Sequence, residues 1–221
     1  DNCADLSVID GVEGNLSYNP ETKTLTMEDV TINATDIEGI VNNVKDLKIE
    51  VVGNNAITSN EACISISKKS TISGSGTLRL KSSVNCGLYV KSSLTVEDVK
   101  LYAEGKWGIA GYDGKSGEIL TLRNAYVEAT GRNGSICDLQ DFILDGCSIT
   151  QPTGAAFDAN VHAVALNGEA VTDKVVIESD NNSIGTITVD VPACKQGIYN
   201  LNGVKLTQQW DDLPAGIYIV D

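Results

Sequence analysis

The chain has 221 residues, of which 42% are hydrophobic and 21% are charged, and its formal net charge is −14 at pH 7. This length and composition predict one sizeable globular domain, with room for a small appendage, and exclude an intrinsically disordered chain. The acidic charge argues against nucleic acid as a partner, and the sequence has no apolar run of about 18 residues that could form a transmembrane segment.

The N-terminal residues 1–24 are predicted to form a cap and a β-hairpin. The segment Ser17–Met27, SYNPETKTLTM, places the turn pair Asn19-Pro20 between two strand-like runs. The chain begins with Asp1 rather than with Met, so we expect that a leader peptide has been removed or omitted.

Residues 25–178 contain a repeat. Three segments are similar copies of one sequence pattern: LTMEDVTINATDIEGI (Leu25–Ile40), LTVEDVKLYAEGKWGI (Leu94–Ile109) and LTLRNAYVEATGRNGSI (Leu120–Ile136). Short runs rich in Val, Ile, Leu and Thr alternate with turns of Gly, Asn, Asp and Ser, and no helical period is sustained. The chain is therefore predicted to be all-β.

Aligning the repeats gives three apolar columns whose members are about 21 to 27 residues apart. A period of this length with several short strands indicates a solenoid, because one coil cannot bury its inward residues by itself. We expect a right-handed parallel β-helix of about six coils. The three columns are Met27, Val51, Ile72, Val96, Leu122 and Leu144; Ile32, Ile57, Leu78, Leu101, Val127 and Ile149; and Ile40, Ile64, Leu88, Ile109, Ile136 and Phe157.

The segments Asn15–Ile32, Ile49–Ile57 and Thr71–Leu78 resemble those of secreted, Bacteroides-type parallel β-helix proteins. Members of that group are loosely described as adhesin-like or carbohydrate-binding. Their fold is similar to that of pectate lyases, whose catalytic motifs this sequence lacks. The resemblance covers about residues 10–178 and implies a secreted or cell-surface location, with periplasmic or outer-membrane association as a variant.

The C-terminal part divides into an Asn-rich linker, residues 179–196, and a tail, residues 197–221. The tail is similar to the C-terminal sorting signal of exported Bacteroidetes proteins, although it stops before the strand that usually follows. The alternative is a small β-hairpin-like appendage.

Four charged residues fall at equivalent turn positions of neighbouring coils: Glu97, Asp98, Arg123 and Asp145. Carboxylates on stacked coils lie within about 5 Å of each other, so they could hold calcium or act as acid and base on a sugar. The competing interpretation is a solvated turn with an ion pair between Glu97 and Arg123. No other cofactor or metal is expected.

Aromatic residues gather in the same coils, and Trp107, Tyr89, Tyr102 and Tyr112 are the candidate ligand-binding residues. An exposed shelf of aromatic rings beside carboxylates is a plausible glycan surface. Alternatively, loops or the C-terminal appendage cover these rings.

The six cysteines include no CxxC pair and there is a single histidine, a composition that argues against a Cys/His zinc site. Cys63 and Cys86 lie on adjacent coils but one position out of register, which leaves a disulfide between them open. Cys147 falls in an inward column and is predicted to be a buried free thiol.

The sequence therefore favours a non-catalytic secreted or cell-surface β-helix that binds glycans or other surface polymers, or acts as an adhesin. One alternative is a polysaccharide lyase or glycoside hydrolase that uses Glu97, Asp98, Arg123 and Asp145. The other alternative is a purely structural stalk. The first interpretation rests largely on the resemblance, and a fold alone does not establish a function.

Overall fold

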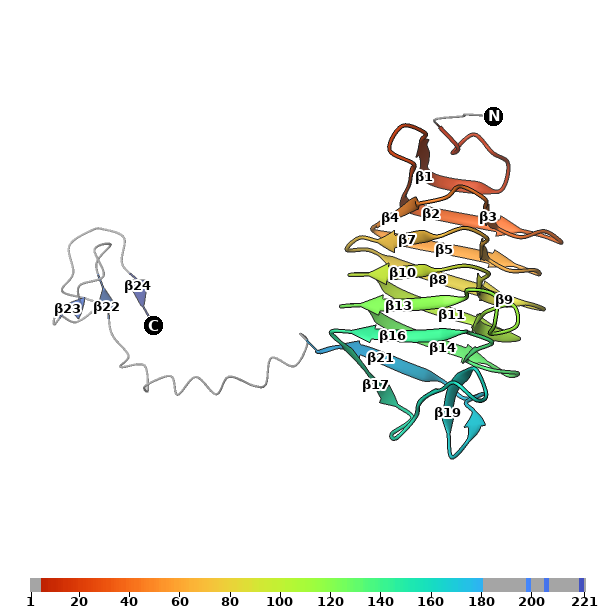
Figure 1. The fold of residues 1–221 in the computed structure, drawn as a ribbon. Helices are drawn as coiled ribbons and strands as arrows, with labels where there is room; N and C mark the ends of the chain where they lie inside the picture. The colour runs from red at the N-terminus through yellow and green to blue at the C-terminus, as the bar shows by residue number, and fades with distance from the viewer. Residues whose placement is uncertain (1–4, 181–197, 200–204, 207–218, 221) are drawn as a thin grey trace. The chain divides into compact units, whose positions relative to one another are not determined.

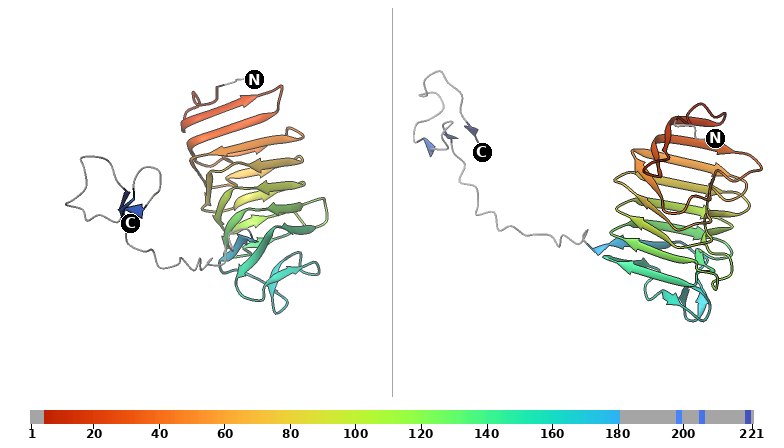
Figure 2. Two further views of the ribbon diagram at one scale, coloured as in Figure 1. Left: turned by 90° about the vertical axis from the view of Figure 1, so that its left-hand side faces the viewer. Right: turned by 45° about the horizontal axis from the view of Figure 1, so that its top comes forward.

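A computed structural model shows that the chain folds as an all-β solenoid, in which strands of successive coils stack in parallel (Figure 1). The structure describes residues 5–180, 198–199, 205–206 and 219–220. Residues 1–183 form one compact unit and residues 184–221 a second. Figure 2 shows the stack from two further sides, with the first and last coils at opposite ends.

Each complete coil contributes one strand to each of three faces. The first and second faces belong to one continuous sheet, because the long strand β2 (Thr24–Ala34) pairs with β4 through its first half and with β5 through its second half. The first face continues with β4 (Leu47–Val52), β7 (Ser70–Ser73), β10 (Leu94–Glu97), β13 (Ile119–Arg123) and β16 (Asp141–Asp145). The second face continues with β5 (Asn54–Ser59), β8 (Thr77–Ser82), β11 (Lys100–Gly105) and β14 (Tyr126–Gly131). The third face consists of β3 (Ile40–Asn42), β6 (Ile64–Ile66), β9 (Cys86–Val90), β12 (Trp107–Ala110) and β15 (Ile136–Cys137).

The N-terminal end is closed by a hairpin. Strand β1 (Val12–Asn19) pairs antiparallel with β2, and Asn19 lies opposite Thr24 across the turn. The hairpin covers an edge that would otherwise present unpaired backbone groups to other chains.

The solenoid has about five turns, slightly fewer than the predicted number of about six coils, and the difference lies at the C-terminal end. Strand β21 (Val175–Ser179) lies antiparallel between β14 and β17 (Cys147–Gln151), so Ile177 separates Val127 from Ile149. Phe157 does not extend the third face either, because β18 (Ala156–Asp158) pairs antiparallel with β19 (Ala163–Leu166), which in turn pairs with β20 (Glu169–Ala170). These antiparallel strands end the parallel stack.

The stacked columns form the core. In the third column the register confirms the predicted order from Ile40 to Ile136, and Ile64, Leu88 and Ile109 are completely buried. Each isoleucine or leucine contacts its equivalent in the next coil, which converts a repeated sequence into one continuous apolar interior.

Two predicted columns were displaced by two residues at one step. Ile72 pairs with Ile49 rather than with Val51, and Leu78 pairs with Asn55 rather than with Ile57. The observed register requires glycine at the turn of the third coil, because Gly74 lies against the Val51 backbone and a Cβ there would come within 2.3 Å of the Val51 carbonyl oxygen. A shift of two residues keeps every side chain on its original face, so the hydrophobic pattern fits both registers.

The turn between the first and second faces has a recurring backbone requirement. Asp29, Gly53, Asp98, Asn124 and Gly146 all have positive φ angles, between 47° and 66°. Asp, Asn and Gly are the residues that adopt this left-handed conformation most readily. The recurrence of acidic and amide residues at these turns is thus accounted for by the backbone.

The C-terminal unit has three described strands. Strand β22 (Ile198–Tyr199) pairs antiparallel with β23 (Lys205–Leu206) and with β24 (Ile219–Val220). Most of the predicted linker 179–196 and of the predicted tail 197–221 lies outside the described residues.

Asn55 occupies an inward position between the second and third coils and is 1% exposed. Its side-chain oxygen accepts a hydrogen bond from the Val30 N–H at 2.9 Å, and its amide nitrogen donates to the Val52 carbonyl at 2.8 Å. The side chain therefore satisfies two backbone groups in the turns of adjacent coils.

We predict that Asn55→Ala lowers the free energy of unfolding by about 1–3 kcal/mol, because it leaves buried backbone groups without partners. Urea unfolding should show a lower midpoint with an unchanged slope. The exposed neighbour Asn54 provides the control, and Asn54→Ala should change stability little. Equal midpoints for the two variants would contradict this role of Asn55.

Candidate functional site

A hollow of about 290 Å³ lies on the third face, where the third and fourth coils meet the loop after β12. It brings together three of the four predicted aromatic residues, which are Tyr89, Trp107 and Tyr112. The remaining lining residues are Asn85, Cys86, Ala110, Gly111 and Asp138.

The positions of two of these rings follow from the stacking register. Tyr89 on β9 lies opposite Ala110 on β12, and the small alanine leaves space beside the tyrosine ring. Trp107 begins β12 opposite Cys86. A lysine ammonium lies over each ring, with Lys91 Nζ 4.4 Å from the Tyr89 centroid and Lys106 Nζ 4.4 Å from the Trp107 centroid. Cation–π contacts of this kind favour one orientation of each ring.

Tyr112 comes from the loop that joins β12 to β13, and it is 67% exposed. The loop is organised by Glu118, whose carboxylate is fully buried and accepts hydrogen bonds from the Ser116 N–H at 2.7 Å and the Asp113 N–H at 3.3 Å. The Asp113 carboxylate in turn accepts the Lys115 N–H at 2.9 Å, and this bond lowers the pKa of Asp113.

The same loop rests on the C-terminal end of the solenoid. Gly114 has a φ of +71°, and a Cβ there would come within 2.6 Å of the His162 ring. The His162 Nδ1 lies 3.2 Å from the Leu139 carbonyl oxygen. The loop is thus ordered both by its internal hydrogen bonds to Glu118 and by the contact of Gly114 with His162. Tyr112 lies at the start of this ordered loop.

Below the hollow lies a small apolar cluster that is separate from the main core. Cys86, Ala110, Cys137 and Ala163 form it, and the rings of Tyr89 and Trp107 pack against it. Burial raises the pKa of Cys86 to about 12 and also raises that of Cys137. Both thiols are therefore protonated at neutral pH and act as small apolar groups.

We predict that Glu118→Gln loosens the loop, because the amide of glutamine presents a donor to one of the two N–H groups that the carboxylate accepts. Amide hydrogen exchange at Asp113 and Ser116 should become at least several-fold faster, as measured by nuclear magnetic resonance. The exposed Glu169 gives the matched control variant Glu169→Gln. Unchanged protection of the two amides would refute the organising role of Glu118.

Tyr102, the fourth predicted aromatic residue, does not line this hollow. It projects from β11 on the second face, where Arg79 Cζ lies 3.9 Å from its ring centroid and the Tyr126 ring centroid lies at 5.8 Å. Outward positions exist on all three faces, so neighbouring coils can carry tyrosines on different sides.

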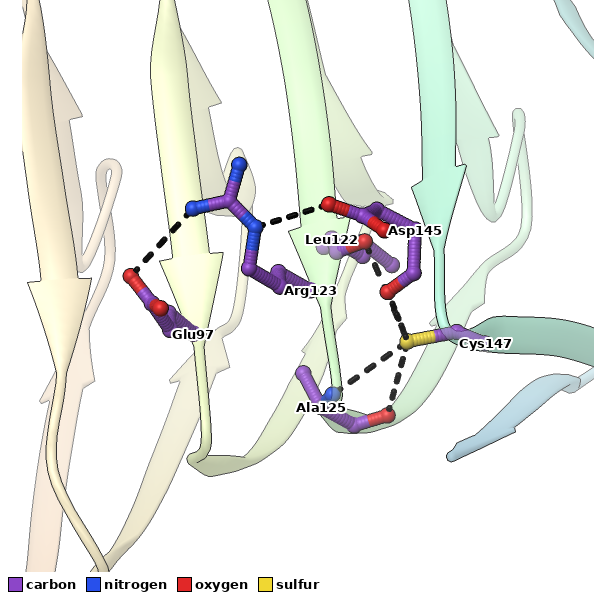
Figure 3. A network of polar contacts seen from close by, with 6 residues as sticks. All are labelled: Glu97, Leu122, Arg123, Ala125, Asp145 and Cys147. Atoms are coloured by element: carbon purple, nitrogen blue, oxygen red, sulfur yellow. Dashed lines mark hydrogen bonds and ion pairs between the residues drawn. The ribbon is translucent and has the colours of Figure 1, made fainter. Parts of the chain in front are cut away.

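The charged residues at the turns of the first face form an ion-paired stack (Figure 3). Arg123 pairs with Glu97 on one side and Asp145 on the other in the strand register. Its Nε lies 2.8 Å from Asp145 Oδ2 and its Nη1 lies 3.7 Å from Glu97 Oε2. The hydrogen bond to Asp145 raises the pKa of Arg123, and Glu97 adds to the effect.

This stack matches the ion-paired interpretation more closely than a catalytic one. The side chains of Glu97, Arg123 and Asp145 are 33%, 43% and 57% exposed, so the pairs are screened by water. Asp98 is a turn residue with a φ of 57°, and its N–H donates to the Arg123 carbonyl at 3.1 Å. Within the described residues, no group of three or more His, Cys, Asp or Glu side chains is arranged to hold a metal ion.

Cys147 fills the corner beneath the ion-paired stack, as Figure 3 also shows. Its sulfur accepts the Ala125 N–H at 3.3 Å and lies 3.6 Å from the Asp145 carbonyl oxygen. The residue is 7% exposed and its thiol is free, which confirms the prediction of a buried free cysteine.

Cys63 and Cys86 are also free and buried, so the structure contains no disulfide between them. They remain one position out of register, because Cys63 precedes Ile64, whose partner Leu88 lies two residues after Cys86. Burial raises the pKa of each thiol to about 12.

Counting thiols tests this assignment. In a Cys3→Ser/Cys194→Ser variant unfolded without reductant, all four remaining cysteines should react with a chromogenic disulfide. The same thiols should be protected in the folded protein at pH 8, where pKa values near 12 keep Cys63 and Cys86 protonated. A count of two in the unfolded variant would instead indicate a disulfide.

Comparison of the chain with protein-family models, with curated proteins and with solved structures found no match. The resemblance to Bacteroides-type proteins and to a sorting signal therefore stays a prediction. The described part of the chain contains no helix of the length and apolarity needed to cross a membrane.

Sequence reasoning missed two residues that line the hollow, Asn85 and Asp138, and the residue that organises the adjacent loop, Glu118. The length of one loop could have indicated this site, because the connection that contains Tyr112 is longer than the turns at the same position of other coils. That Glu118 folds back into the loop as a buried acceptor could not be read from its spacing.

Proposed function

We propose that the protein is a non-catalytic, secreted or cell-surface β-solenoid that binds glycans or related surface polymers through the hollow on the third face. The observation that carries this proposal is the convergence of Tyr89, Trp107 and Tyr112 around one hollow that also contains Asn85 and Asp138. Sugars present apolar C–H faces and hydroxyl edges, and this combination of rings with amide and carboxylate groups is complementary to both.

The shape of the site supports binding of part of a longer chain. The hollow, about 290 Å³, is at the lower limit of ligand pockets, which measure about 300–1,000 Å³. Tyr112 is largely exposed beside it, and its loop is ordered by hydrogen bonds to the buried Glu118 carboxylate. A loop that is already ordered loses little backbone freedom on binding, which favours affinity.

The support for a lyase or hydrolase is weaker. Such an enzyme would need free carboxylates or a free base facing a groove. Glu97 and Asp145 are instead ion-paired with Arg123 from opposite sides. The secreted or cell-surface location is part of our proposal and rests on the acidic charge and the resemblance alone.

A glycan array provides the test, with the wild-type protein beside Trp107→Ala and Glu97→Gln. We expect Trp107→Ala to weaken binding at least tenfold, equivalent to about 1.4 kcal/mol, because it removes one ring of the hollow. The control variant Glu97→Gln should bind as the wild type does, with or without a calcium chelator.

Three outcomes would oppose the proposal. Binding that survives Trp107→Ala would move the site away from the hollow. Loss of binding in Glu97→Gln or on removal of calcium would favour the turn stack and an enzyme. No binding to any glycan would leave a structural stalk as the better interpretation.

A further inference from the structure

The second face of the solenoid carries an ordered grid of polar and aromatic side chains. Arg79, Tyr102 and Glu128 are direct neighbours across β8, β11 and β14. The outward residues two positions further along these strands form a parallel row. That row consists of Lys81, Glu104 and Thr130. Together the two rows line a hollow of about 240 Å³.

Most charges of this grid are already neutralised by a partner. Lys81 Nζ lies 3.2 Å from Glu104, and Lys174 Nζ lies 3.2 Å from Glu128. The Tyr126 hydroxyl also donates to Glu128, which lowers the pKa of Glu128 and raises that of Tyr126. Glu128 is therefore a satisfied, ionised carboxylate.

Within the described part of the chain, Arg79 makes no ion pair of this kind, although its charge adds to the effect of the Tyr126 hydrogen bond in lowering the pKa of Glu128. Its guanidinium lies over the Tyr102 ring with Cζ 3.9 Å from the centroid, and the residue is exposed. None of the hydrogen bonds or ion pairs among the described residues involves this guanidinium. Stacking on a ring uses the flat face of the group and leaves its in-plane N–H donors available.

The groups around Arg79 indicate which class of ligand the hollow would bind. A guanidinium held in place by stacking binds carboxylate or phosphate oxygens in a bidentate manner. The nearby Glu104 and Glu128 carboxylates oppose a second negative charge, which disfavours phosphate. The same carboxylates and the Thr130 hydroxyl are suitable partners for sugar hydroxyl groups.

We propose that this hollow binds the carboxylate of an acidic sugar, with Arg79 as the anion-binding residue and Glu104 and Thr130 as partners for the hydroxyls. The site lies on the second face and does not use Trp107 or Tyr89. It therefore stands independently of the hollow on the third face, and either assignment can fail without the other.

Titration followed by amide chemical shifts tests the proposal with four probes. D-glucuronate and D-glucose differ only in the carboxylate, whereas acetate and phosphate supply an anion without sugar hydroxyls. We expect D-glucuronate to shift the amide signals of Arg79, Tyr102 and Glu128 in a saturable manner. Glucose should shift none of them, and acetate and phosphate should bind at least tenfold more weakly.

Two variants that each remove one arginine distinguish a specific role of Arg79 from the effect of a change in net charge. Arg79→Gln should weaken D-glucuronate binding at least tenfold, whereas Arg132→Gln, an exposed arginine outside this hollow, should leave it unchanged. Because Arg79 is exposed, the variant should keep the wild-type circular dichroism spectrum. Trp107→Ala should bind D-glucuronate normally.

The proposal is overturned if D-glucuronate shifts no signals on the second face, or if Arg79→Gln binds it as the wild type does. Equal affinity for acetate or phosphate would reduce the site to a simple anion contact and would also overturn the assignment to an acidic sugar.

Discussion

The structure depends on hydrogen bonding between successive coils in a fixed register. Parallel strands lie about 4.8 Å apart, so each inward side chain rests on its equivalent one coil away. In the third column this places Ile64, Leu88 and Ile109 in one line with no exposed surface. A single coil has no second layer against which to bury these residues, and the stack is therefore the smallest unit that is stable.

The fixed register between coils also distinguishes residues that the repeat explains from residues that are candidates for function. Turn residues such as Asp98 and Asn124 are determined by a left-handed backbone, and the nearby charges pair with each other across coils. Function is better sought where a coil departs from the repeat. The loop after β12 is such a departure, because Glu118 is buried to organise it and Tyr112 is left exposed at its start. The second face differs in another way, since its unusual feature is an arginine whose carboxylate neighbours already have other partners.

The all-β fold could be predicted from the alternation of short strand-like runs with turn residues. The third apolar column could be predicted because Ile40, Leu88 and Ile109 each follow a glycine, which fixes how these segments align. The register at Ile72 could not be predicted, since a displacement of two residues preserves the buried face. The insertion of β21 between β14 and β17 could not be predicted either, because an antiparallel strand from later in the chain carries the same apolar pattern as a sixth coil.

For the site, coil position was sufficient to group Tyr89 with Trp107. Coil position could not show that Tyr102 lies in a different hollow, because the hydrophobic period distinguishes inward from outward positions but does not identify which of the three faces a residue occupies.

The proposed glycan site lies where the fourth coil departs from the repeat. The most direct measurement is hydrogen exchange of the intact chain, with and without an oligosaccharide identified on the array. We expect added protection in residues 107–118 and around Tyr89 and Asp138, with the turns at Glu97 and Asp145 unchanged. Protection confined to those turns, or spread along the ends of the solenoid without change at residues 107–118, would contradict this assignment.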